Sequence, residues 1–463
     1  MSLPSTTAVR GVNIGLPAAG QGRRSRRPEP ARYRWMDQWL IAKGAPLVDL
    51  VERTVSFLNH HESCVAPRRR ARRPKDQLSY RLLVENLVAN LAYAVLMPPE
   101  GGRLAVSLGH RRRTAQDNSD LSRQLSEVIN LLASADLLEV YAPATVRREA
   151  SSVRPSDGFA RQVLRAGVDL SHFGRHSNEP LILLRRRGDD DTLIEFDETA
   201  ETSQLAARVR RINVFLASAS IDFLDDGELP RVDPYNRHLR RYFKIAADQE
   251  KPTFDGGGRL FGGFWQTVKS SRRANIRMSG EPVVALDYSS MFTRLAYAHL
   301  GAVPPEGDLY AIPGAEGYRS GIKLAMNCFL FDLSSSRRSW PDAMGVGVGA
   351  DKETLRDNRD DTSVEITGRL PEGWTVGKTK RAILTRHPRL REIWGRGIGH
   401  GLMFKESEIL LDVLDRLIRE GIVGLPLHDA VLVRRSDVCE AKDIMEKAAG
   451  LRGGGYLPVM AKH

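Results

Sequence analysis

Apolar residues recur at helical spacing through much of the first half of the chain. This spacing predicts helices over 78–96 and 205–216, where apolar residues return every three or four positions. Between these helices, two short apolar runs at 181–184 and 193–196 flank a polar stretch rich in arginine and aspartate, as the strands of a β-hairpin would. We therefore expect both helices and strands before the midpoint of the chain.

The segment 118–140 has a more specific pattern. Asn118 or Ser119 can cap an amphipathic helix that runs to about Ala135, and a strand-like run at 136–140 follows it. In winged helix-turn-helix modules a strand follows the recognition helix in the same way. Most amphipathic helices, however, only cover a core. Both interpretations stay open for this segment.

In the second half, two buried strands are each followed by an aspartate. The apolar run Val283–Leu286 reads as a strand that delivers Asp287 at its end, before a helix that starts near Met291. Two further apolar runs flank His428 and Asp429, as the strands of a tight hairpin would. A single aspartate at such a place is usually a helix cap or a turn residue, so neither one identifies a site alone.

A third pattern lies between these two aspartates. Residues four positions apart would share one face of a helix, and they are Arg319, Lys323, Asn327 and Phe331. Two cations one turn apart suit a triphosphate, and an aromatic ring two turns further can stack on a base or sugar. The simpler interpretation is a solvated basic stripe that ends in a core aromatic residue.

The charge of the chain favours a polyanionic partner. It has 69 Lys and Arg against 57 Asp and Glu, a net charge of +12, which favours nucleic acid but is also compatible with a role in solubility alone. Three isolated cysteines without CxxC spacing predict neither a disulfide framework nor a zinc knuckle. No apolar run approaches the roughly 20 residues that span a bilayer, so we expect no membrane insertion and a cytoplasmic location.

Taken in order, the three segments of the second half resemble motifs A, B and C of the family A DNA polymerases and of the related phage-type single-subunit RNA polymerases. Each motif is matched by its characteristic residues: Asp287-Tyr288-Ser289 and Arg294 for motif A, Arg319 and Lys323 for motif B, and Leu427-His428-Asp429 for motif C. The resemblance covers roughly residues 281–463, less than half of the chain.

This resemblance implies an α+β protein with a polymerase right-hand palm, an antiparallel sheet backed by helices, and helical fingers. Asp287 and Asp429, with the backbone carbonyl of Tyr288, would hold two Mg²⁺ ions, for which Mn²⁺ could substitute. Lys323 would be catalytic together with the two aspartates, because it can protonate the pyrophosphate as it leaves.

The resemblance also implies contacts with the substrates. The nucleoside triphosphate would be bound by Arg319, Lys323, Phe331, Phe292 and Tyr288. The nucleic acid would be contacted by His428, Arg294, Arg259 and Gln266, the last two upstream of motif A where such enzymes contact the duplex.

The chain departs from the family pattern at four positions. Phe292 stands where these DNA polymerases have a glutamate that excludes the ribose 2′-hydroxyl, and Ala430 replaces the glutamate of motif C. The stacking aromatic and the terminal tyrosine of the fingers helix become Asn327 and Phe331. A bulky ring at Phe292 could still act as a steric gate, so the preference for deoxynucleotides or ribonucleotides stays open.

We therefore expect three parts: a disordered basic tail at 1–34, a mainly helical nucleic-acid-binding region at 35–230 that contains the winged-helix candidate, and a polymerase palm and fingers at 231–463. The expected function is template-directed nucleotidyl transfer on a primed nucleic acid, as a DNA polymerase or primase that could replicate a mobile element. The alternative is a DNA-binding replication initiator or regulator with a catalytically inactive, degenerate polymerase fold. The sequence does not predict an oligomeric state.

Overall fold

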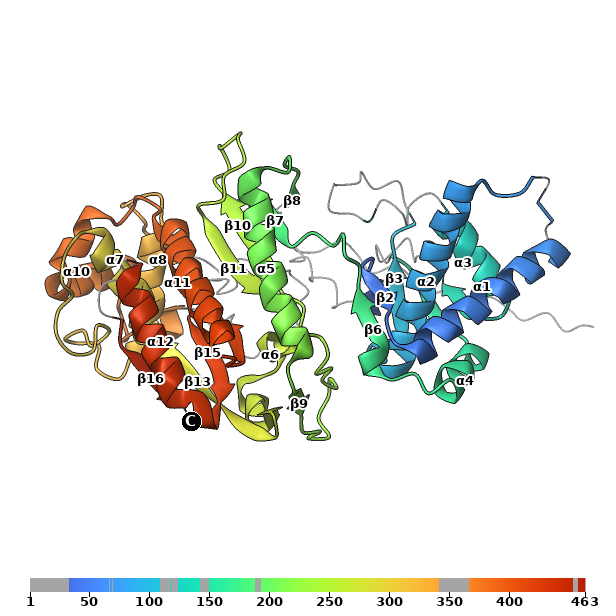
Figure 1. Ribbon diagram of the computed structural model, residues 1–463. Helices are drawn as coiled ribbons and strands as arrows, with labels where there is room; N and C mark the ends of the chain where they lie inside the picture. The colour runs from blue at the N-terminus through green and yellow to red at the C-terminus, as the bar shows by residue number, and fades with distance from the viewer. Residues whose placement is uncertain are drawn as a thin grey trace, which may run out of the picture.

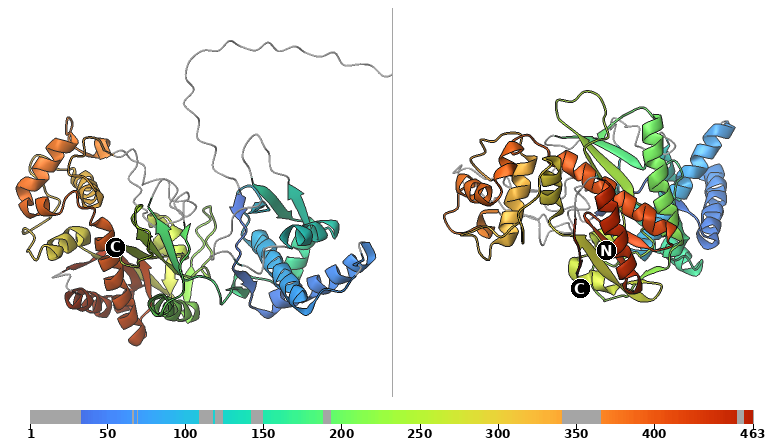
Figure 2. Two further views of the ribbon diagram at one scale, coloured as in Figure 1. Left: turned by 90° about the horizontal axis from the view of Figure 1, so that it is seen from above. Right: turned by 60° about the vertical axis from the view of Figure 1, so that its left-hand side comes forward.

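The computed structural model describes residues 33–65, 67–68, 70–108, 118, 124–141, 150–187, 193–340, 366–452 and 457–462. Helices and several separate sheets are mixed along the chain, which makes this an α+β protein, as expected. A smaller N-terminal unit lies beside a larger C-terminal unit, in blue to teal and in green to red, respectively (Figure 1 and the left view of Figure 2).

The N-terminal unit contains a four-stranded sheet with helices packed on it. The strands, in the order of their hydrogen bonding, are β1 (Tyr33–Trp35), β3 (Arg103–Val106), β5 (Ser151–Pro155) and β4 (Leu138–Tyr141). The helices are α1 (Ala45–Val65), α2 (Pro74–Leu96), α3 (Leu125–Ser134) and α4 (Asp157–Arg165). A separate pair is formed by β2 (Leu40–Ala42) and β6 (Phe173–Arg175), preceded by the short 3₁₀ helix η3 (Leu170–His172). This unit has its own apolar core, which runs from Leu40 to Val168.

The winged-helix candidate is observed only in part. The helix expected from Asn118 is described from Leu125, as α3, and β4 follows it. β4 pairs with β5 and β5 pairs with β3, all antiparallel, which is compatible with a winged-helix order. The exposed residues of α3 are Ser126, Glu127, Asn130 and Ser134, without any basic side chain. The winged-helix interpretation therefore stays a prediction.

The largest sheet of the C-terminal unit is antiparallel throughout. Its strands run in the order β14 (Gly424–Leu427), β15 (Ala430–Arg434), β13 (Glu281–Tyr288), β12 (Ile276–Met278) and β9 (Ile221–Phe223), and β16 (Val459–Lys462) also pairs with β13. β15 lies along one edge of β13, whereas β12 and β16 share the other edge. The hairpin expected around His428 and Asp429 is confirmed as β14 and β15.

A second sheet lies beside the first. Its order is β11 (Gly257–Phe261), β10 (Arg240–Ile245), β7 (Ile182–Arg186) and β8 (Leu193–Ile194). The antiparallel pairing of β7 with β8 confirms the hairpin expected from the two apolar runs. β7 pairs with β10 in parallel, so the chain must cross over between them, and α5 (Ala200–Ser218) lies in that connection.

The remaining helices are α6 (Phe264–Thr267), α7 (Met291–His299), α8 (Arg319–Phe331), α10 (Val376–Arg386), α11 (Gly399–Arg419) and α12 (Val438–Leu451), with the 3₁₀ helices η4 (Ser270–Asn275), η5 (Ile366–Arg369), η6 (Pro388–Glu392) and η7 (Arg435–Asp437). Of these, α6, α11 and α12 pack on the sheets, whereas α8 and α10 pack on other helices. The sequence from about Met403 to Glu420 predicts a helix that packs behind the hairpin through Ile409, Val413 and Leu417. The structure has this helix as α11, and the three residues are buried.

Strand pairing moves the boundary expected at residue 230. β7, β8 and α5 were expected with the N-terminal region, but β7 pairs with β10 and β9 pairs with β12 of the C-terminal unit. The core of these elements is shared with α11 and β15 and starts at Leu181. The two units therefore separate between β6 and β7, because a strand belongs with the strands to which it is hydrogen-bonded.

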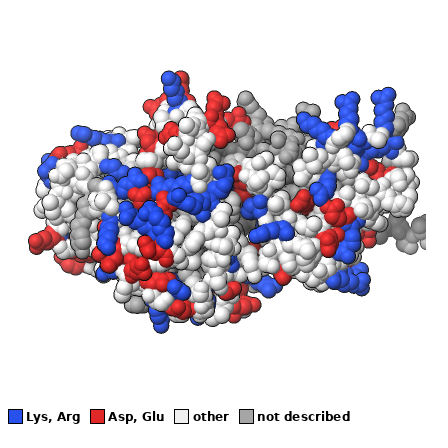
Figure 3. All heavy atoms as spheres, in the orientation of Figure 1, with Lys and Arg blue, Asp and Glu red and all other residues white. Residues whose placement is uncertain are grey.

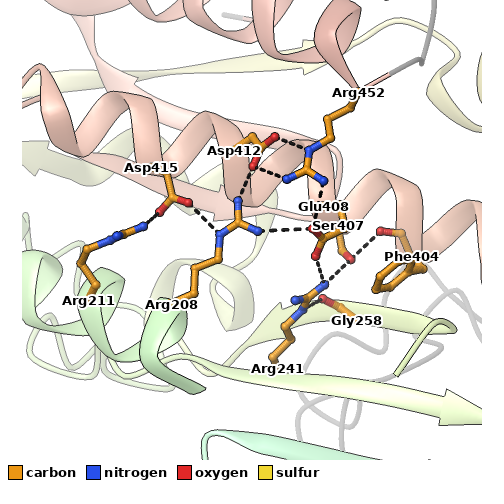
Figure 4. Close-up of polar contacts among 10 residues, drawn as sticks. All are labelled: Arg208, Arg211, Arg241, Gly258, Phe404, Ser407, Glu408, Asp412, Asp415 and Arg452. Carbon is orange, nitrogen blue, oxygen red and sulfur yellow. Dashed lines mark hydrogen bonds and ion pairs between the residues drawn. The ribbon is translucent and has the colours of Figure 1, made fainter. Parts of the chain in front are cut away.

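A network of ion pairs fastens α5 and β10 to α11 (Figure 4). Arg208 of α5 contacts three acidic residues on successive turns of α11, which are Glu408, Asp412 and Asp415. Arg241 of β10 is fully buried and bonds to the carbonyl of Gly258 at 2.7 Å and to Glu408 at 2.7 Å. Basic and acidic side chains are correspondingly intermixed over α5 and α11 in Figure 3.

Arg241→Met should lower the free energy of unfolding by about 3 kcal/mol, because Glu408 loses its most buried partner. The matched control is Arg211→Met, which removes an exposed partner of Asp415 and should cost at most about 1 kcal/mol. Urea unfolding followed by tryptophan fluorescence measures both. Equal losses in the two variants would contradict the anchoring role of Arg241.

Candidate functional site

Asp287 and Asp429 lie side by side where β13 meets the β14–β15 hairpin. The antiparallel register places Asp287 opposite Ala430, the residue that follows Asp429. The backbone N–H of Tyr288 donates a hydrogen bond of 3.3 Å to the carbonyl of Asp429. The two aspartates are 142 residues apart in the sequence (429 − 287), and it is the strand pairing that brings them together.

The Asp287 carboxylate is largely buried and lies close to a second negative charge. Its side chain is 14% exposed, and Oδ1 is buried without a hydrogen-bond partner. Burial raises the pKa of Asp287 above its ordinary value, and the negative charge of Asp429 raises it further. An ion pair between Oδ2 and the ammonium of Lys462, with a weaker effect of Lys323, opposes this shift. Such a carboxylate pair suits a divalent cation.

The donor atoms at this position fit Mg²⁺ or Mn²⁺. Within the described ranges, no group of three or more His, Cys, Asp or Glu residues could hold a metal. The set would therefore consist of Asp287, Asp429 and a backbone carbonyl such as that of Tyr288. Magnesium is commonly held by only one or two carboxylates, with water and substrate phosphates as its other ligands. The unpartnered Oδ1 of Asp287 is a hard oxygen donor of the required kind.

The side chain of Tyr288 cannot bind a nucleotide where the structure places it, which corrects that expectation. It is 2% exposed, and its hydroxyl donates a hydrogen bond of 2.6 Å to the carbonyl of Met445 in α12. Successive side chains of a strand point to opposite faces, so Asp287 and Tyr288 cannot both face the site. Only the backbone of Tyr288 remains available as a ligand.

The two cations of α8 differ in their surroundings within the protein. Lys323 is exposed, and its positive charge acts on Asp287, so it lies on the side of the carboxylates as expected. Arg319, one turn earlier, forms two hydrogen bonds of 2.6 and 3.0 Å with Asp308 and lies 5.0 Å from the ring centroid of Tyr310. This ion pair is exposed and worth little, so a phosphate can compete for Arg319.

Phe292 and Phe331 contact each other. Their ring centroids are 5.9 Å apart and their planes are inclined by 29°, which is a stacked arrangement. At both positions the chain departs from the family A pattern. The contact between the two rings joins α7 to the end of α8. The ring of His400 meets Phe331 edge-on at 5.0 Å, and the guanidinium of Arg259 lies 5.6 Å from Phe292.

Arg259 is held by a carboxylate that the sequence analysis missed. Glu406 of α11 is fully buried and accepts hydrogen bonds of 2.7 and 2.9 Å from the Arg259 guanidinium. Burial raises the pKa of Glu406, and the negative charges of Asp429 and Asp287 add to the shift, so Glu406 lies next to the carboxylate pair. A glutamate on the apolar face of α11, between Leu402 and Ile409, is the signal that could have identified it.

Gln266 positions the hairpin instead of facing a ligand. Its amide nitrogen donates to the carbonyls of Leu260 and Pro426 at 3.0 and 2.9 Å, and its oxygen accepts from the N–H of Gly262 at 2.9 Å. The expected contact of Gln266 with nucleic acid is contradicted, because its side-chain amide is buried and hydrogen-bonded to the backbone. Trp265 also donates to Pro426, so α6 fastens β14 twice.

The other two expected nucleic-acid contacts remain near the site. His428 occupies the hairpin turn with a φ of 58°, and its ring lies 5.6 Å from that of Phe261. Burial and the charges of Arg259 and Arg273 lower the pKa of His428 to about 3, so its ring is neutral at physiological pH. Arg294, in the first turn of α7, donates from Nε to the carbonyl of Ser289 at 3.1 Å, in the turn that follows β13.

The site thus combines adjacent carboxylates, a cationic helix and an aromatic pair in an α+β framework. No family model matches the chain, and no curated protein shows significant sequence similarity to it. None of the helices in the described part of the chain is long and apolar enough to cross a membrane. The function of the chain must therefore be inferred from the geometry of the site and from the resemblance of the three motifs.

Asp287→Asn should raise the free energy of unfolding near neutral pH in metal-free buffer, because it removes a buried charge beside Asp429. A raised pKa in the folded state means that ionising Asp287 costs stability as the pH rises through that pKa. The gain should therefore shrink towards acidic pH and disappear where the aspartate is protonated in both states, below about pH 4. Denaturant unfolding between pH 4 and 8 measures this.

The control for this prediction is Asp222→Asn, which removes an exposed aspartate from β9 of the same sheet. Asp222→Asn should change the free energy of unfolding only slightly at every pH in this measurement. If Asp287→Asn instead destabilised the protein most at neutral pH, the ion pair with Lys462 would outweigh the repulsion, and the account of the site would be wrong.

Proposed function

We propose that this protein is a template-directed nucleotidyltransferase with a divergent, family A-like polymerase palm and fingers. One observation carries the proposal: Asp287 and Asp429, from distant segments, lie side by side with an unpartnered carboxylate oxygen, and Lys323 of α8 acts on the same pair. Polymerases require two carboxylates that bind two divalent ions beside a cation for the triphosphate. The antiparallel sheet, the helix and the motif order support this function together.

In this proposal Asp287 and Asp429 hold two Mg²⁺ or Mn²⁺ ions, with the carbonyl of Tyr288 as a further ligand. The ions supply activation of the attacking hydroxyl and neutralise charge on the leaving pyrophosphate. Lys323 binds the phosphates and can donate a proton to the departing pyrophosphate. Arg319 leaves Asp308 to bind the same triphosphate.

The remaining residues would line the space occupied by the substrates. The stacked rings of Phe292 and Phe331 form an apolar wall beside the carboxylates, where the sugar or base of the incoming nucleotide would lie. Arg259, fixed by Glu406, and His428 lie on the Asp429 side, where the primer end would be positioned. Whether Phe292 selects the sugar stays a prediction, so the proposal includes DNA polymerase and primase chemistry. The proposed partners are a nucleic acid template, a primer and nucleoside triphosphates. The proposed location is the cytoplasm.

A second candidate function is favoured by the internal ion pairs of the site. Lys462 pairs with Asp287, and Arg319 pairs with Asp308, so two groups that the reaction needs are engaged within the protein. In a replication initiator or regulator with an inactive palm, these pairs would persist and the protein would bind DNA without extending a primer.

In the test, the protein is incubated with primed DNA and RNA templates, Mg²⁺ and both sets of nucleotides. Asp287→Asn and Asp429→Asn should each reduce primer extension at least about a thousandfold, equivalent to roughly 4 kcal/mol of transition-state stabilisation. Lys323→Met should reduce it by about 100-fold or more, as expected for a lost general acid. Binding of the primed template should change only a few-fold, because these residues act on the reacting phosphates.

Asp222→Asn is again the matched control and should extend primers at the normal rate. Extension that survives both aspartate substitutions would refute the catalytic assignment. If the unmodified protein binds every template but extends none of them, the inactive DNA-binding function replaces the proposal.

A further inference from the structure

The connection between α1 and α2 carries a dense cluster of positive charge. Residues 67–75 include six Lys or Arg residues and no Asp or Glu. Basic side chains project from the N-terminal unit where this connection joins the start of α2, at the upper right of Figure 3. The cluster lies outside the three motifs of the C-terminal unit, so the proposed function gives it no role.

Two arginines of this connection are held by contacts within the unit. The side chain of Arg72 is 7% exposed, donates hydrogen bonds of 2.8 and 2.9 Å to Glu62, and lies with its guanidinium 3.7 Å from the ring centroid of Tyr80. Arg68 donates a hydrogen bond of 2.8 Å to Glu62 and also pairs with Glu127 of α3. These contacts fasten the connection to both α1 and α3.

Three other cations of the same segment remain available to a partner. Arg70, Arg73 and Lys75 are exposed, and their side chains form no ion pair or hydrogen bond with the part of the chain that the structure describes. We call these three residues the outer cations. Asp76, in the first turn of α2, can neutralise only one of them, and the two glutamates that hold the connection are already paired. The outer cations therefore present a net positive charge on an accessible surface.

Two contacts show how the connection lies relative to α3. Near the end of α1, Nε2 of His61 lies 3.0 Å from the hydroxyl oxygen of Ser134, the last residue of α3. Further along the chain, Arg68 pairs with Glu127, in the first turn of α3. The chain therefore runs along α3 towards its N-terminal end, and the outer cations follow directly.

The exposed side of α3 is polar. Its exposed residues are Ser126, Glu127, Asn130 and Ser134, of which Glu127 is paired with Arg68. Serine and asparagine side chains form hydrogen bonds with DNA bases and phosphates. In helix-turn-helix modules the N-terminal residues of the recognition helix contact base edges in the major groove. Cations at this end of α3 would therefore lie beside the phosphates that border the groove.

We propose that the outer cations bind the phosphate backbone of a DNA duplex, with the N-terminal end of α3 directed into the adjacent major groove. Arg70 and Arg73 donate hydrogen bonds to phosphate oxygens, and Lys75 contributes a third positive charge. A DNA duplex is favoured over an RNA duplex, because the major groove of A-form RNA is too deep and narrow to be read by side chains.

The contacts of Arg68 and Arg72 hold the connection against the unit, which reduces the conformational entropy lost on binding. The positive charge is thus supplied beside α3, which has no exposed basic residue of its own. This inference concerns a site separate from the carboxylate pair, and it does not rest on the proposed polymerase function.

The experiment measures binding of a fluorescein-labelled, blunt-ended DNA duplex by anisotropy over a range of KCl concentrations. A blunt-ended duplex offers no primed template to the carboxylate pair. Each phosphate contact contributes about −0.9 to the slope of log K against log salt for B-DNA. Arg70→Met and Arg73→Met should therefore each reduce the slope by about 0.9 in magnitude and weaken binding about eightfold at 0.1 M KCl. Lys75→Met should have a similar effect and replaces Arg73→Met if that variant disturbs the start of α2.

The matched control is Arg165→Met, which makes the same change of charge at an exposed site in the last turn of α4. Figure 1 shows α4 at the lower end of the N-terminal unit and the α1–α2 connection at its upper end. The control should leave affinity and slope unchanged. Normal binding by both Arg70→Met and Arg73→Met would overturn the inference. An equal loss in Arg165→Met would also overturn it, since the effect would then be one of net charge.

An RNA duplex of the same length tests the choice of nucleic acid and should bind more weakly than the DNA duplex. Equal affinity for the two duplexes, with equal losses in the variants, would overturn the assignment to DNA.

Primer extension by the same proteins separates this inference from the proposed function. If the unmodified protein extends no primer but Arg70→Met and Arg73→Met lower the affinity for the duplex, the proposed function fails and the duplex-binding site stands. If primers are extended while both variants bind the duplex normally, only this inference fails.

Discussion

The repulsion between the Asp287 and Asp429 carboxylates determines how the rest of the site is arranged. Register between β13 and β15 fixes these two groups side by side, and burial prevents water from screening them fully. Positive charge must therefore be supplied nearby. In the metal-free protein, Lys462 supplies it through a direct ion pair and Lys323 from α8. A divalent cation would supply it more effectively, so the fold holds the carboxylates in a state that favours metal binding.

Ion pairs within the protein also hold the cations of the site in place. Glu406 orients Arg259 in a buried, two-point contact, which fixes the position of the guanidinium. Asp308 holds Arg319 in an exposed pair that costs little to break. The difference in burial thus separates a permanent contact from an exchangeable one. Lys462, at 64% exposure, belongs to the exchangeable kind.

Local patterns predicted the elements around the site well, whereas contacts between distant elements could not be predicted. The hairpin at His428, the strand that ends at Asp287 and the helices α7, α8 and α11 follow from apolar spacing and turn residues. Pairing of β7 with β10 and of β9 with β12 depends on hydrogen bonds between segments more than 50 residues apart, so the boundary at 230 was misplaced. Tyr288 was assigned to a ligand by its position in motif A and Gln266 by its position upstream of that motif. Strand alternation and backbone hydrogen bonds direct both side chains inward. Lys462 lies in a strand too short to show a pattern.

The central claim is that Asp287 and Asp429 together bind divalent cations. Anomalous X-ray diffraction from crystals soaked in Mn²⁺, with a primed template and a non-hydrolysable nucleoside triphosphate, tests it most directly. The account predicts manganese peaks within bonding distance of both carboxylates, about 2.0–2.3 Å from the nearest oxygens, with Lys462 displaced from Asp287. Crystals that contain the nucleotide but show no manganese at these carboxylates, with Lys462 still paired to Asp287, would contradict it.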